Sequence, residues 1–475
     1  MYLFKQVFRQ ALPMALLAVM LIALCFSPLP AAASHPLPML VGEKVEKDEK
    51  EELLLPSYER YLKDPSKLGF SPDFRLFKTA YMYLKTQYVV AVEDAVLQKS
   101  CEKEVNRLLK TAKAAPSTSF KVTSFNSLEK EIEKFSPPMN NDLLWYAAIQ
   151  GILLGLNDPY TIIMTPKEYT TLMEQMQSVS FGGIGIYVEL DKEHNNALTV
   201  FEPIEGTPAF KAGLQSQDAI VFVDGVSTKG MALDMAVSKM RGPIGTTVVL
   251  TIKRPGVKQL LKFSLQRENI KIHSVSCKVL QGKYGYIRIR TFGEDTGDEF
   301  AKALNKLEEK KVKGLIVDLR NNGGGYIDAA VKVCSKFVEP GGVVVSVMGR
   351  TGAKNAYRSD GSQRVSLPLL VLVNKFSASA SEITAGAIQD DGLGILMGTK
   401  TYGKGSVQQI LPIPGGGAFK ITTAHYYTPK GRNIDKKGIA PDVTVTMEPK
   451  QVGRKDDTQL RSAVLYLDKK QGQNL

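Results

Sequence analysis

The feature that most constrains this chain is a regular alternation of strand-like and helix-like segments from residue 284 onward. The strand-like segments are short and apolar on both faces: YGYIRIRTF, GLIVDLR, VVVSV and LPLLVLVN. Apolar residues at helical spacing predict helices near 299–308 and 327–337 between them. Strands buried on both faces and separated by helices are typical of a largely parallel sheet covered by helices. The C-terminal half therefore predicts an α/β layer structure.

Two other patterns precede this region, and 475 residues are enough for several domains. Between 73 and 176 the apolar spacing is helical, and Asn141 and Asp142 can cap a helix that buries Leu143 and its neighbours. Between 182 and 267, short β-branched strands and turn residues surround one helical segment, MALDMAVSKM. This second pattern predicts a small β-rich module.

The N-terminus has the pattern of a secretory signal peptide. Lys5 and Arg9 precede an uncharged apolar run at 11–26, and the small residues at 31–33 suit cleavage after Ala33. An uncleaved segment would instead anchor the protein in a membrane, and no later apolar run reaches the length of a membrane span. We therefore expect an exported, extracytoplasmic protein of the periplasm or cell envelope, membrane-associated if the segment is retained.

Composition narrows the classes of function. The net charge is +13, but the 61 basic residues are interleaved with 48 acidic ones, which is typical of solvated surface rather than of a nucleic-acid-binding face. Four cysteines are too few and too scattered for a disulfide framework or a zinc site. We expect neither a nucleic-acid partner nor a metal.

Ser379 lies where the strand LPLLVLVN gives way, through a turn of small residues, to a helix. With Glu382 it fits the S-x-x-E capping box, so the serine could be a helix cap and nothing more. A serine at a helix N-terminus also has free backbone N–H groups and the positive end of the helix dipole beside it, which can hold a tetrahedral oxyanion. Ala378 and Ala380 leave room for a substrate backbone. This segment alone leaves both interpretations open.

A serine nucleophile needs a base, and the chain offers two kinds. The histidines are His35, His194, His273 and His425. His425 is the best candidate for a Ser-His-Asp arrangement, although it stands in no recognisable triad motif. Lys404, in the glycine-flanked segment GTKTYGKG, could serve instead if burial away from carboxylates keeps it neutral. The three glycines of DLRNNGGG could bring a backbone N–H close enough to complete an oxyanion hole.

The segment GTKTYGKG also raises a different class of function. It nearly matches the phosphate-binding pattern G-x-x-x-x-G-K-[ST], which would indicate a P-loop NTPase. Gly405 replaces the hydroxyl residue of that pattern, and the following SVQQILPI has the pattern of a strand, whereas a phosphate loop opens a helix. Both departures argue against nucleotide binding.

Four segments in order resemble the carboxyl-terminal processing proteases, also called tail-specific proteases: DLRNNGGG, NKFSASASEITAGAIQD, GTKTYGKGSVQ and TTAHYYTPKGRNIDKKGIAPDV. The resemblance extends over 75–445, and the β-rich module resembles a PDZ domain. It implies an α/β fold with a crotonase-like α/β spiral as protease core. The implied parts are a signal peptide (1–33), a helical N-terminal region (34–177), a PDZ domain (178–268), the protease core (269–446) and a C-terminal tail (447–475).

The resemblance also implies roles for single residues and no cofactor. Ser379 would be the nucleophile, Lys404 the general base, and Gln408 the residue that orients the lysine. The N–H groups of Gly325 and Ala380 would form the oxyanion hole. Two departures from the family pattern bear on substrate fit rather than on the Ser/Lys dyad: Lys375-Phe376 stands where many members carry Glu-Gly, and His425 where a lysine or similar residue is common.

Within the module, the segment FGGIGI (181–186) matches the loop with which PDZ domains hold a C-terminal carboxylate. The N–H groups around Gly183, Ile184 and Gly185 would form the carboxylate nest, and the bound tail would add as a strand. We therefore expect protein or peptide substrates bound by their C-terminal tails. Arg241 is a candidate polar link between module and core. A non-catalytic PDZ scaffold is the alternative, and the sequence leaves homo-oligomerisation open.

Overall fold

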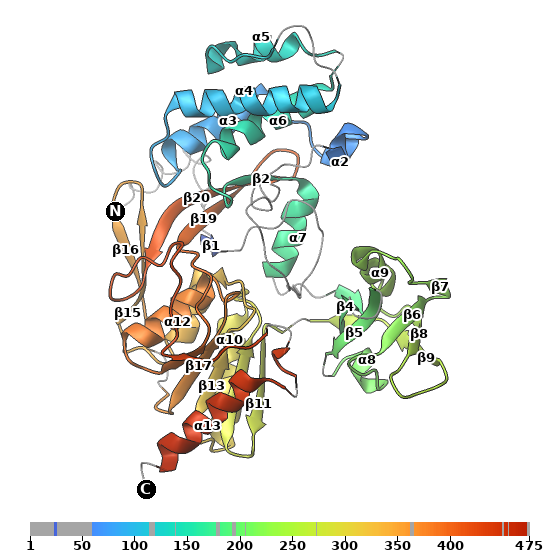
Figure 1. Ribbon diagram of the computed structural model, residues 1–475, viewed down its shortest axis with the longest axis vertical. Coiled ribbons are helices and arrows are strands. Elements are labelled where there is room, and N and C mark those ends of the chain that lie inside the picture. The colour runs from blue at the N-terminus through green and yellow to red at the C-terminus, as the bar shows by residue number, and fades with distance from the viewer. Residues whose placement is uncertain are drawn as a thin grey trace, which may run out of the picture.

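The computed structural model describes residues 23–25, 59–113, 119–137, 139–176, 181–191, 196–204, 206–271, 273–361, 365–448, 451–454 and 456–472. In Figure 1 a layer of helices lies above a central α/β body, and a β-rich module lies to one side of that body. Most of the expected signal peptide, and residues 34–58 after it, lie outside the described residues. Among the described residues, no helix combines the length and the apolar character that a membrane crossing requires.

The helical region packs around a core of its own. Its helices are α2 (Glu59–Leu62), α3 (Phe74–Thr86), α4 (Asp94–Thr111), α5 (Leu128–Glu133) and α6 (Asn141–Leu154). Helix α6 is the central one, since residues on all of its faces are buried. The cap expected at Asn141 or Asp142 is instead Asn140, whose Oδ1 accepts from the Leu143 N–H at 3.1 Å. Because Asn141 already has helical geometry, the capping residue must precede it.

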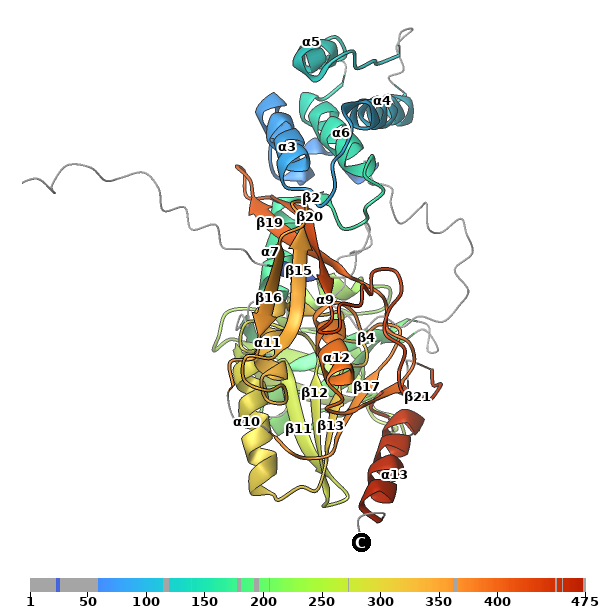
Figure 2. The ribbon, with the colours of Figure 1, turned by 90° about the vertical axis from the view of Figure 1, so that its left-hand side faces the viewer.

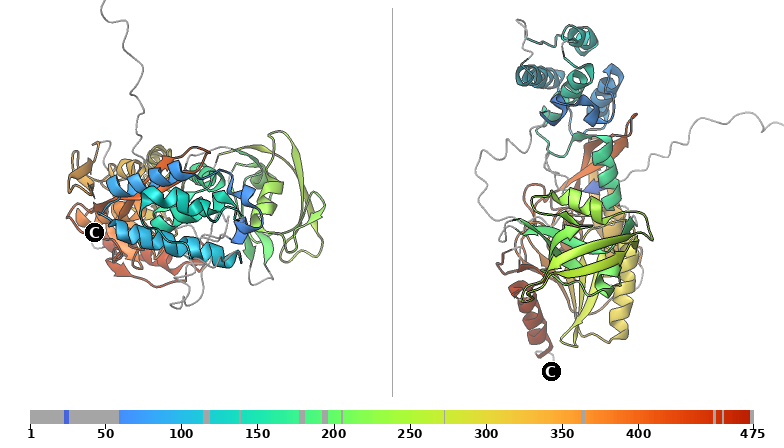
Figure 3. Two further views of the ribbon diagram at one scale, coloured as in Figure 1. Left: turned by 90° about the horizontal axis from the view of Figure 1, so that it is seen from above. Right: turned by 90° about the vertical axis from the view of Figure 1, so that its right-hand side faces the viewer.

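The β-rich module forms one antiparallel sheet of its own, in the order β4-β5-β6-β8-β9 with β7 paired to β6. The elements are β4 (Ile186–Asp191), β5 (Ala197–Pro203), α8 (Pro208–Lys211), β6 (Ala219–Val223), β7 (Val226–Ser227), α9 (Leu233–Met240), β8 (Thr247–Lys253) and β9 (Leu261–Gln266). Figure 3 shows this sheet face-on in its right-hand view. At the module's two ends, β3 (Phe181–Gly183) pairs with β10 (Glu268–Ile270).

The central body contains the expected parallel sheet, in the order β11-β12-β13-β17-β18-β21. The strands are β11 (Val275–Leu280), β12 (Tyr284–Ile289), β13 (Leu315–Asp318), β17 (Leu369–Val373), β18 (Ile395–Gly398) and β21 (Val443–Thr444). All neighbours are parallel except β11, which pairs antiparallel with β12. The prediction of an α/β layer structure is therefore confirmed.

Helices cover both faces of this sheet. Helices α10 (Thr296–Glu309), α11 (Ile327–Cys334) and α12 (Ala380–Asp390) share one buried core with it. Helix α13 (Thr458–Gly472), within the expected C-terminal tail, packs on the opposite face against Tyr284, Ile316 and Leu370. Figure 2 shows α10 and α13 on opposite sides of the strands. Alternation along β12 explains the two faces, because Tyr284 and Tyr286 contact α13 while Ile287 and Ile289 belong to the other core.

A second sheet connects this body to the helical region. Its order is β14-β1-β19-β20-β15-β16, with β2 paired to β20. The strands are β1 (Ala23–Cys25), β2 (Ile162–Met164), β14 (Gly325–Tyr326), β15 (Val343–Gly349), β16 (Lys354–Arg358), β19 (Ser406–Pro412) and β20 (Ala418–Tyr427), and α7 (Pro166–Met176) follows β2. Phe419 and Ile421 of β20 complete the core of the helical region. The sheet therefore ties that region to the body.

Candidate active site

Ser379 lies at the turn between the buried strand β17 and helix α12. Ser377 closes the start of this turn, since its N–H donates to the Asn374 C=O at 2.8 Å and its hydroxyl accepts from the Asn374 N–H at 2.9 Å. Ser379 has φ +61° and ψ −116°, a conformation that costs a non-glycine residue about 1–3 kcal/mol and that the surroundings must enforce. Its Oγ is buried and has no hydrogen-bond partner among the described residues. The hydroxyl thus makes no close hydrogen bond, while Ser379 and Glu382 form the expected capping box, in which the Glu382 carboxylate accepts from the Ser379 N–H.

The glycine-rich segment after β13 lies directly against this serine. The Asn322 C=O accepts from the Ala378 N–H at 3.0 Å and from the Ser381 hydroxyl at 2.9 Å. Gly324 has φ +104°, and a Cβ there would lie 2.8 Å from the Ser379 Cβ. Glycine is required at this position both by backbone geometry and by the close approach to the nucleophile. The segment predicted to supply an oxyanion hole is therefore brought to Ser379.

Gly325 and Ala380, the two residues named for that hole, flank the same point. Ala380 is the first residue of α12, and its backbone nitrogen would lie 2.9 Å from a Cβ placed on Gly324. Gly325 follows directly, with φ +149°, and its own Cβ would lie only 2.2 Å from the Phe292 carbonyl oxygen. Their backbone amides thus belong to two segments that meet beside Ser379.

Lys404 lies in the loop between β18 and β19, and none of its surface is exposed. Its Nζ lies 4.4 Å from the centre of the Tyr160 ring. The residues after it, from Ser406 on, form strand β19 rather than a helix. A phosphate loop must open a helix at this point, so the P-loop interpretation of GTKTYGKG is wrong.

Glu382, expected only as part of a capping box, joins the loops of Ser379 and Lys404. It lies at N3 of α12, and its Oε2 accepts from the Ser379 N–H and from the Lys404 N–H, each at 2.9 Å. Its Oε1 accepts from the Gly403 N–H at 2.7 Å and from the Thr401 hydroxyl at 2.5 Å. Burial raises the pKa of Glu382, and the four donors act in the opposite direction. Sequence reasoning missed this link because S-x-x-E signals only the cap.

Gln408 is buried on β19, four residues after Lys404 in sequence. Its Nε2 donates to the Ser406 hydroxyl at 2.9 Å and to the Thr422 hydroxyl at 3.2 Å. Its Oε1 has no hydrogen-bond partner among the described residues. The two donated bonds fix the orientation of the amide and leave its oxygen available as an acceptor.

Neither of the two described histidines, His273 and His425, forms a triad with Ser379. His425 lies on β20, and its Nδ1 is buried without a hydrogen-bond partner among the described residues. A triad histidine is oriented by an acid at this second nitrogen, so the arrangement lacks its acid. His35 and His194 lie outside the described residues.

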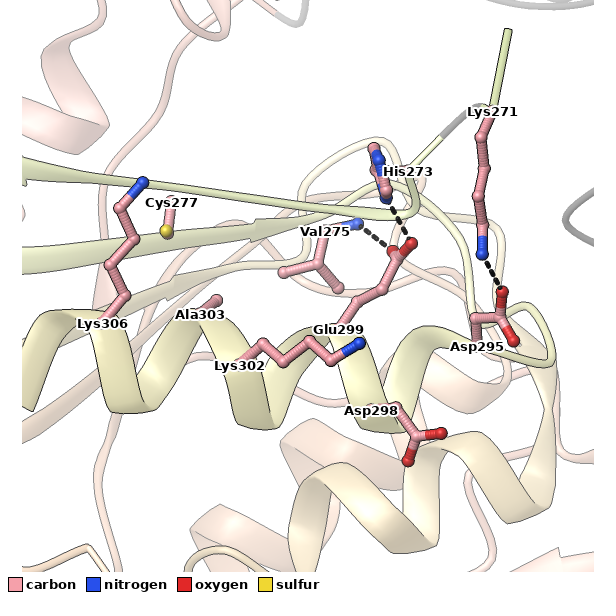
Figure 4. Close-up of a pocket in the computed structure, with 10 residues that line it drawn as sticks. All are labelled: Lys271, His273, Val275, Cys277, Asp295, Asp298, Glu299, Lys302, Ala303 and Lys306. Atoms are coloured by element: carbon pink, nitrogen blue, oxygen red, sulfur yellow. Dashed lines mark hydrogen bonds and ion pairs between the residues drawn. The ribbon is translucent and has the colours of Figure 1, made fainter. Parts of the chain in front are cut away.

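His273 lines a separate cavity of about 370 Å³ between β11 and α10, shown in Figure 4. Its Nδ1 is hydrogen-bonded to Glu299 Oε1 at 2.6 Å. Glu299 Oε2 also accepts from the N–H groups of Ser274 and Val275, at 2.8 and 3.1 Å. None of Ser379, Lys404 and Gln408 lines this cavity. Among the described residues, no group of three or more His, Cys, Asp or Glu side chains could hold a metal ion.

A buried ion cluster lies at the start of the glycine-rich segment DLRNNGGG and stabilises it. Arg320 donates to both carboxylate oxygens of Asp318, at 2.9 and 2.6 Å, and to both oxygens of Asp457, at 2.8 Å each. The three side chains are at most 2% exposed. Burial alone would raise the pKa of Asp318, but the Arg320 charge and its hydrogen bonds hold that pKa below its ordinary value. Asp457 directly precedes α13, so the cluster ties the C-terminal helix to the segment beside Ser379.

In the module, the carbonyls of the FGGIGI loop are turned inward. The Ile184 C=O accepts from the Ala209 N–H at 2.9 Å, and the Gly185 C=O accepts from the Thr207 hydroxyl at 3.0 Å. Because a trans peptide points its N–H away from its C=O, the N–H groups of Gly185 and Ile186 face the other side of the loop. The Ile184 side chain is only 2% exposed and belongs to the module core, so it offers no apolar surface to a bound tail.

Contacts between module and core involve other residues than Arg241. The Arg241 guanidinium stacks over the Phe181 ring at 4.0 Å, a contact inside the module. From the core, Arg290 reaches Glu202 at 2.8 Å and lies 5.2 Å from the centre of the Tyr187 ring. These contacts connect the module to the end of β12, one strand from β13 and its glycine-rich segment.

Comparisons with known proteins match both parts of the chain. The peptidase family S41 model matches residues 283–445, and the PDZ domain model matches residues 172–253. The chain is 37% identical over 329 residues to a carboxy-terminal processing protease of Bacillus subtilis, covering 68% of each chain. It is 35% identical over 332 residues to a carboxyl-terminal-processing protease of a Picosynechococcus species, covering 69% of this chain and 80% of the relative.

A third relative is similar in sequence, and a solved structure is similar in fold. A carboxy-terminal-processing protease of Bartonella bacilliformis is 41% identical over 305 residues, covering 63% of this chain and 68% of the relative. The fold is similar to that of a Bacteroides fragilis protein described as an S41 protease, with a TM-score of 0.52, 16% identity, and coverage of 85% of this chain and 98% of that one. The expected protease core with a PDZ module and N-terminal helices is thereby confirmed as the fold. The chain belongs to the carboxy-terminal processing proteases, serine peptidases of family S41 that carry a PDZ domain.

Proposed function

We propose that this protein is an exported endopeptidase that holds the C-terminal tail of a protein substrate in its PDZ domain and cleaves the chain with a dyad of Ser379 and Lys404. The observation that carries the proposal is the joint burial of these two residues in loops that share one carboxylate, Glu382. The free Ser379 hydroxyl oxygen beside a glycine-rich segment adds support.

In the proposed reaction, the neutral amine of Lys404 takes the proton of the Ser379 hydroxyl while Oγ attacks the scissile carbonyl. The N–H groups of Gly325 and Ala380 stabilise the oxyanion of the tetrahedral intermediate. Lys404 then gives its proton to the leaving amine, and water hydrolyses the acyl-enzyme. The open Oε1 of Gln408 is an acceptor for the lysine's N–H and would orient it.

The substrate chain would bind as a strand between β14 and β19. A short strand from the chain's own N-terminal segment, β1, already pairs antiparallel with both, and Leu24 lies opposite Tyr326 on one side and Gln408 on the other. The two edges are therefore one strand apart next to Gly325, which suits an extended peptide. Cleavage of the signal peptide after Ala33 would remove β1 and free both edges for a substrate.

The PDZ loop would bind the terminal carboxylate of the tail. The outward N–H groups of Gly185 and Ile186 support this role, together with the neighbouring amides of Gly183 and Ile184. Phe181 and Ile186, both partly exposed, offer apolar surface for the tail's last side chains. The N-terminal pattern of residues 1–33 supports export to the periplasm or cell envelope.

The dyad is tested by single substitutions assayed on a peptide with a free C-terminus. Ser379→Ala and Lys404→Ala should each abolish cleavage while the far-UV circular dichroism spectrum stays that of the wild type. Because the two residues act as a unit, the double variant should be no worse than either single one. His425→Ala is the control that should stay active. Near-normal turnover in Lys404→Ala together with loss in His425→Ala would make the histidine the base and overturn the proposal.

A further inference from the structure

The backbones of Ser379 and Lys404 are joined from two sides. On the N–H side, Glu382 Oε2 receives both N–H groups at 2.9 Å. On the carbonyl side, the Tyr426 hydroxyl lies 3.3 Å from the Ser379 carbonyl oxygen and donates a very short hydrogen bond to the Lys404 carbonyl oxygen. One carboxylate and one phenol thus contact the same two residues, whose side chains would exchange a proton.

Each of the two bridging side chains is itself held firmly. Glu382 is fully buried in the first turn of α12, and its other oxygen is occupied by Gly403 and Thr401. Tyr426 is fully buried on β20, and its own N–H donates to the Gly405 C=O at 2.9 Å. A buried side chain with several fixed partners cannot follow a displaced loop, so each bridge fixes the distance between the two backbones.

We infer that Glu382 and Tyr426 are positioning residues for the reaction: together they form a clamp that sets the Ser379 hydroxyl against the Lys404 amine. The inference rests on the proposed Ser379–Lys404 dyad. Neither residue needs to touch substrate, because their contacts are with the backbones of the reacting residues. A displacement of about 1 Å can cost on the order of 100-fold in rate, so the clamp acts on the chemical step rather than on substrate binding.

Two conservative substitutions test the two residues of the clamp separately. Glu382→Gln keeps the size of the side chain but replaces one oxygen by an NH₂ group, which can only donate, opposite groups that also donate. Tyr426→Phe keeps the ring and removes the hydroxyl that reaches both carbonyls. Both variants retain Ser379, Lys404 and Gln408 and the whole PDZ module.

Matched controls exist at sites away from the dyad. Glu299 in the first turn of α10 is also largely buried, and it also accepts from two backbone N–H groups and a serine hydroxyl. Figure 4 shows its bonds to Val275 and His273. Tyr284 is also fully buried, and its hydroxyl donates to Asp468 at 2.7 Å. Tyr284 is the first residue of β12, whereas the Ser379 turn follows the last residue of β17. Because β12, β13 and β17 are parallel, the two positions lie at opposite ends of the strands. Glu299→Gln and Tyr284→Phe therefore remove comparable hydrogen bonds without touching the clamp.

The experiment measures kcat and KM for a peptide substrate with the protein that remains after removal of residues 1–33, so that β1 does not lie between β14 and β19, and well below each variant's Tm. We expect kcat to fall about 100-fold in Glu382→Gln and at least about 10-fold in Tyr426→Phe, with KM within about 3-fold of the wild type. The controls Glu299→Gln and Tyr284→Phe should keep kcat within about 2-fold, even where their Tm falls as much as that of the clamp variants.

The inference is overturned if folded clamp variants keep near-normal kcat, or if the controls lose kcat to the same extent. Where Glu382→Gln fails to fold, Tyr426→Phe decides alone, because it changes neither charge nor volume appreciably. Lys404→Ala is measured alongside to separate two failures. An inactive Lys404→Ala with normal clamp variants refutes the clamp only, whereas an active Lys404→Ala refutes the dyad on which the clamp depends.

Discussion

Replacing Asp457 with alanine should destabilise the protease core strongly, although this residue stands outside the matched family region and far from Ser379 in sequence. The substitution removes two of the hydrogen bonds that neutralise Arg320, a guanidinium that is only 1% exposed. Arg320 keeps its ion pair with Asp318, so the cost comes from the two lost hydrogen bonds to a buried charged group, each of which contributes about 1.5–3 kcal/mol. Loss of the bonds from Gly453 and Leu460 to the same carboxylate would loosen the start of α13 as well.

The assay is denaturant unfolding followed by circular dichroism, with the free energy of unfolding compared at an unchanged slope against denaturant concentration. Since a native protein is stable by only about 5–15 kcal/mol, the expected loss is a large share of the total. Asp468→Ala is the matched control: Asp468 lies on α13 and pairs with a basic side chain, Lys283, but its own side chain is 38% exposed, so the loss should be much smaller. Equal losses in the two variants would refute the reasoning that burial of the Arg320 cluster sets the cost.

Three further outcomes are expected. Ser379→Ala should change Tm little, because the Ser379 hydroxyl makes no hydrogen bond within the described residues; unfolding of the variant would show that the hydroxyl is structural after all. A peptide ending in a free apolar residue should be cleaved faster than the same peptide with an amidated C-terminus. Thr207→Val removes one of the two hydrogen bonds that hold the Gly185 carbonyl, the other coming from the Ile204 N–H, and should reduce that preference; equal rates for acid and amide below saturation would exclude tail sensing by the PDZ module. Because Arg320 lowers the pKa of Asp318, this carboxyl stabilises the fold at pH values above its unfolded pKa of about 3.9, and the contribution is lost as the pH falls through its lower folded pKa. The measurement is the free energy of unfolding against pH in the acid range. If this free energy declined equally in Arg320→Met and in the wild type, the explanation would be contradicted.

Local patterns in the sequence were sufficient to predict the strand, turn and helix around the nucleophile, and to predict where in the chain the nucleophile lies. The run of buried residues in β17, the small residues after it and the helical spacing that follows predict the strand, turn and helix around Ser379, and the structure has each of them. The strand after Lys404 was likewise expected from the segment SVQQILPI, and Ser406–Pro412 form β19. These features depend on neighbours in sequence, which is the information that periodicity carries.

The hydrogen bonds and ion pairs that hold the site together could not be predicted from local patterns. Glu382 bonds to residues in a second loop, and nothing in the S-x-x-E pattern reveals partners beyond the helix it caps. Arg320 and Asp457 meet only because α13 packs on the far face of the sheet, and a charged residue has no periodicity that would indicate its partner. The burial of Ile184 was not predictable either, since an apolar loop residue can face either the module core or the ligand.

The most direct test of the central claim is to remove residues 1–33, treat the remaining protein with a serine-directed fluorophosphonate probe, and locate the adduct by mass spectrometry. The account predicts one adduct, on Ser379, that disappears in Ser379→Ala and forms far more slowly in Lys404→Ala, because the lysine amine must take the serine proton. Absence of any adduct would indicate a non-catalytic PDZ scaffold. An adduct on another residue, or one that forms equally fast in Lys404→Ala, would contradict the Ser379–Lys404 dyad.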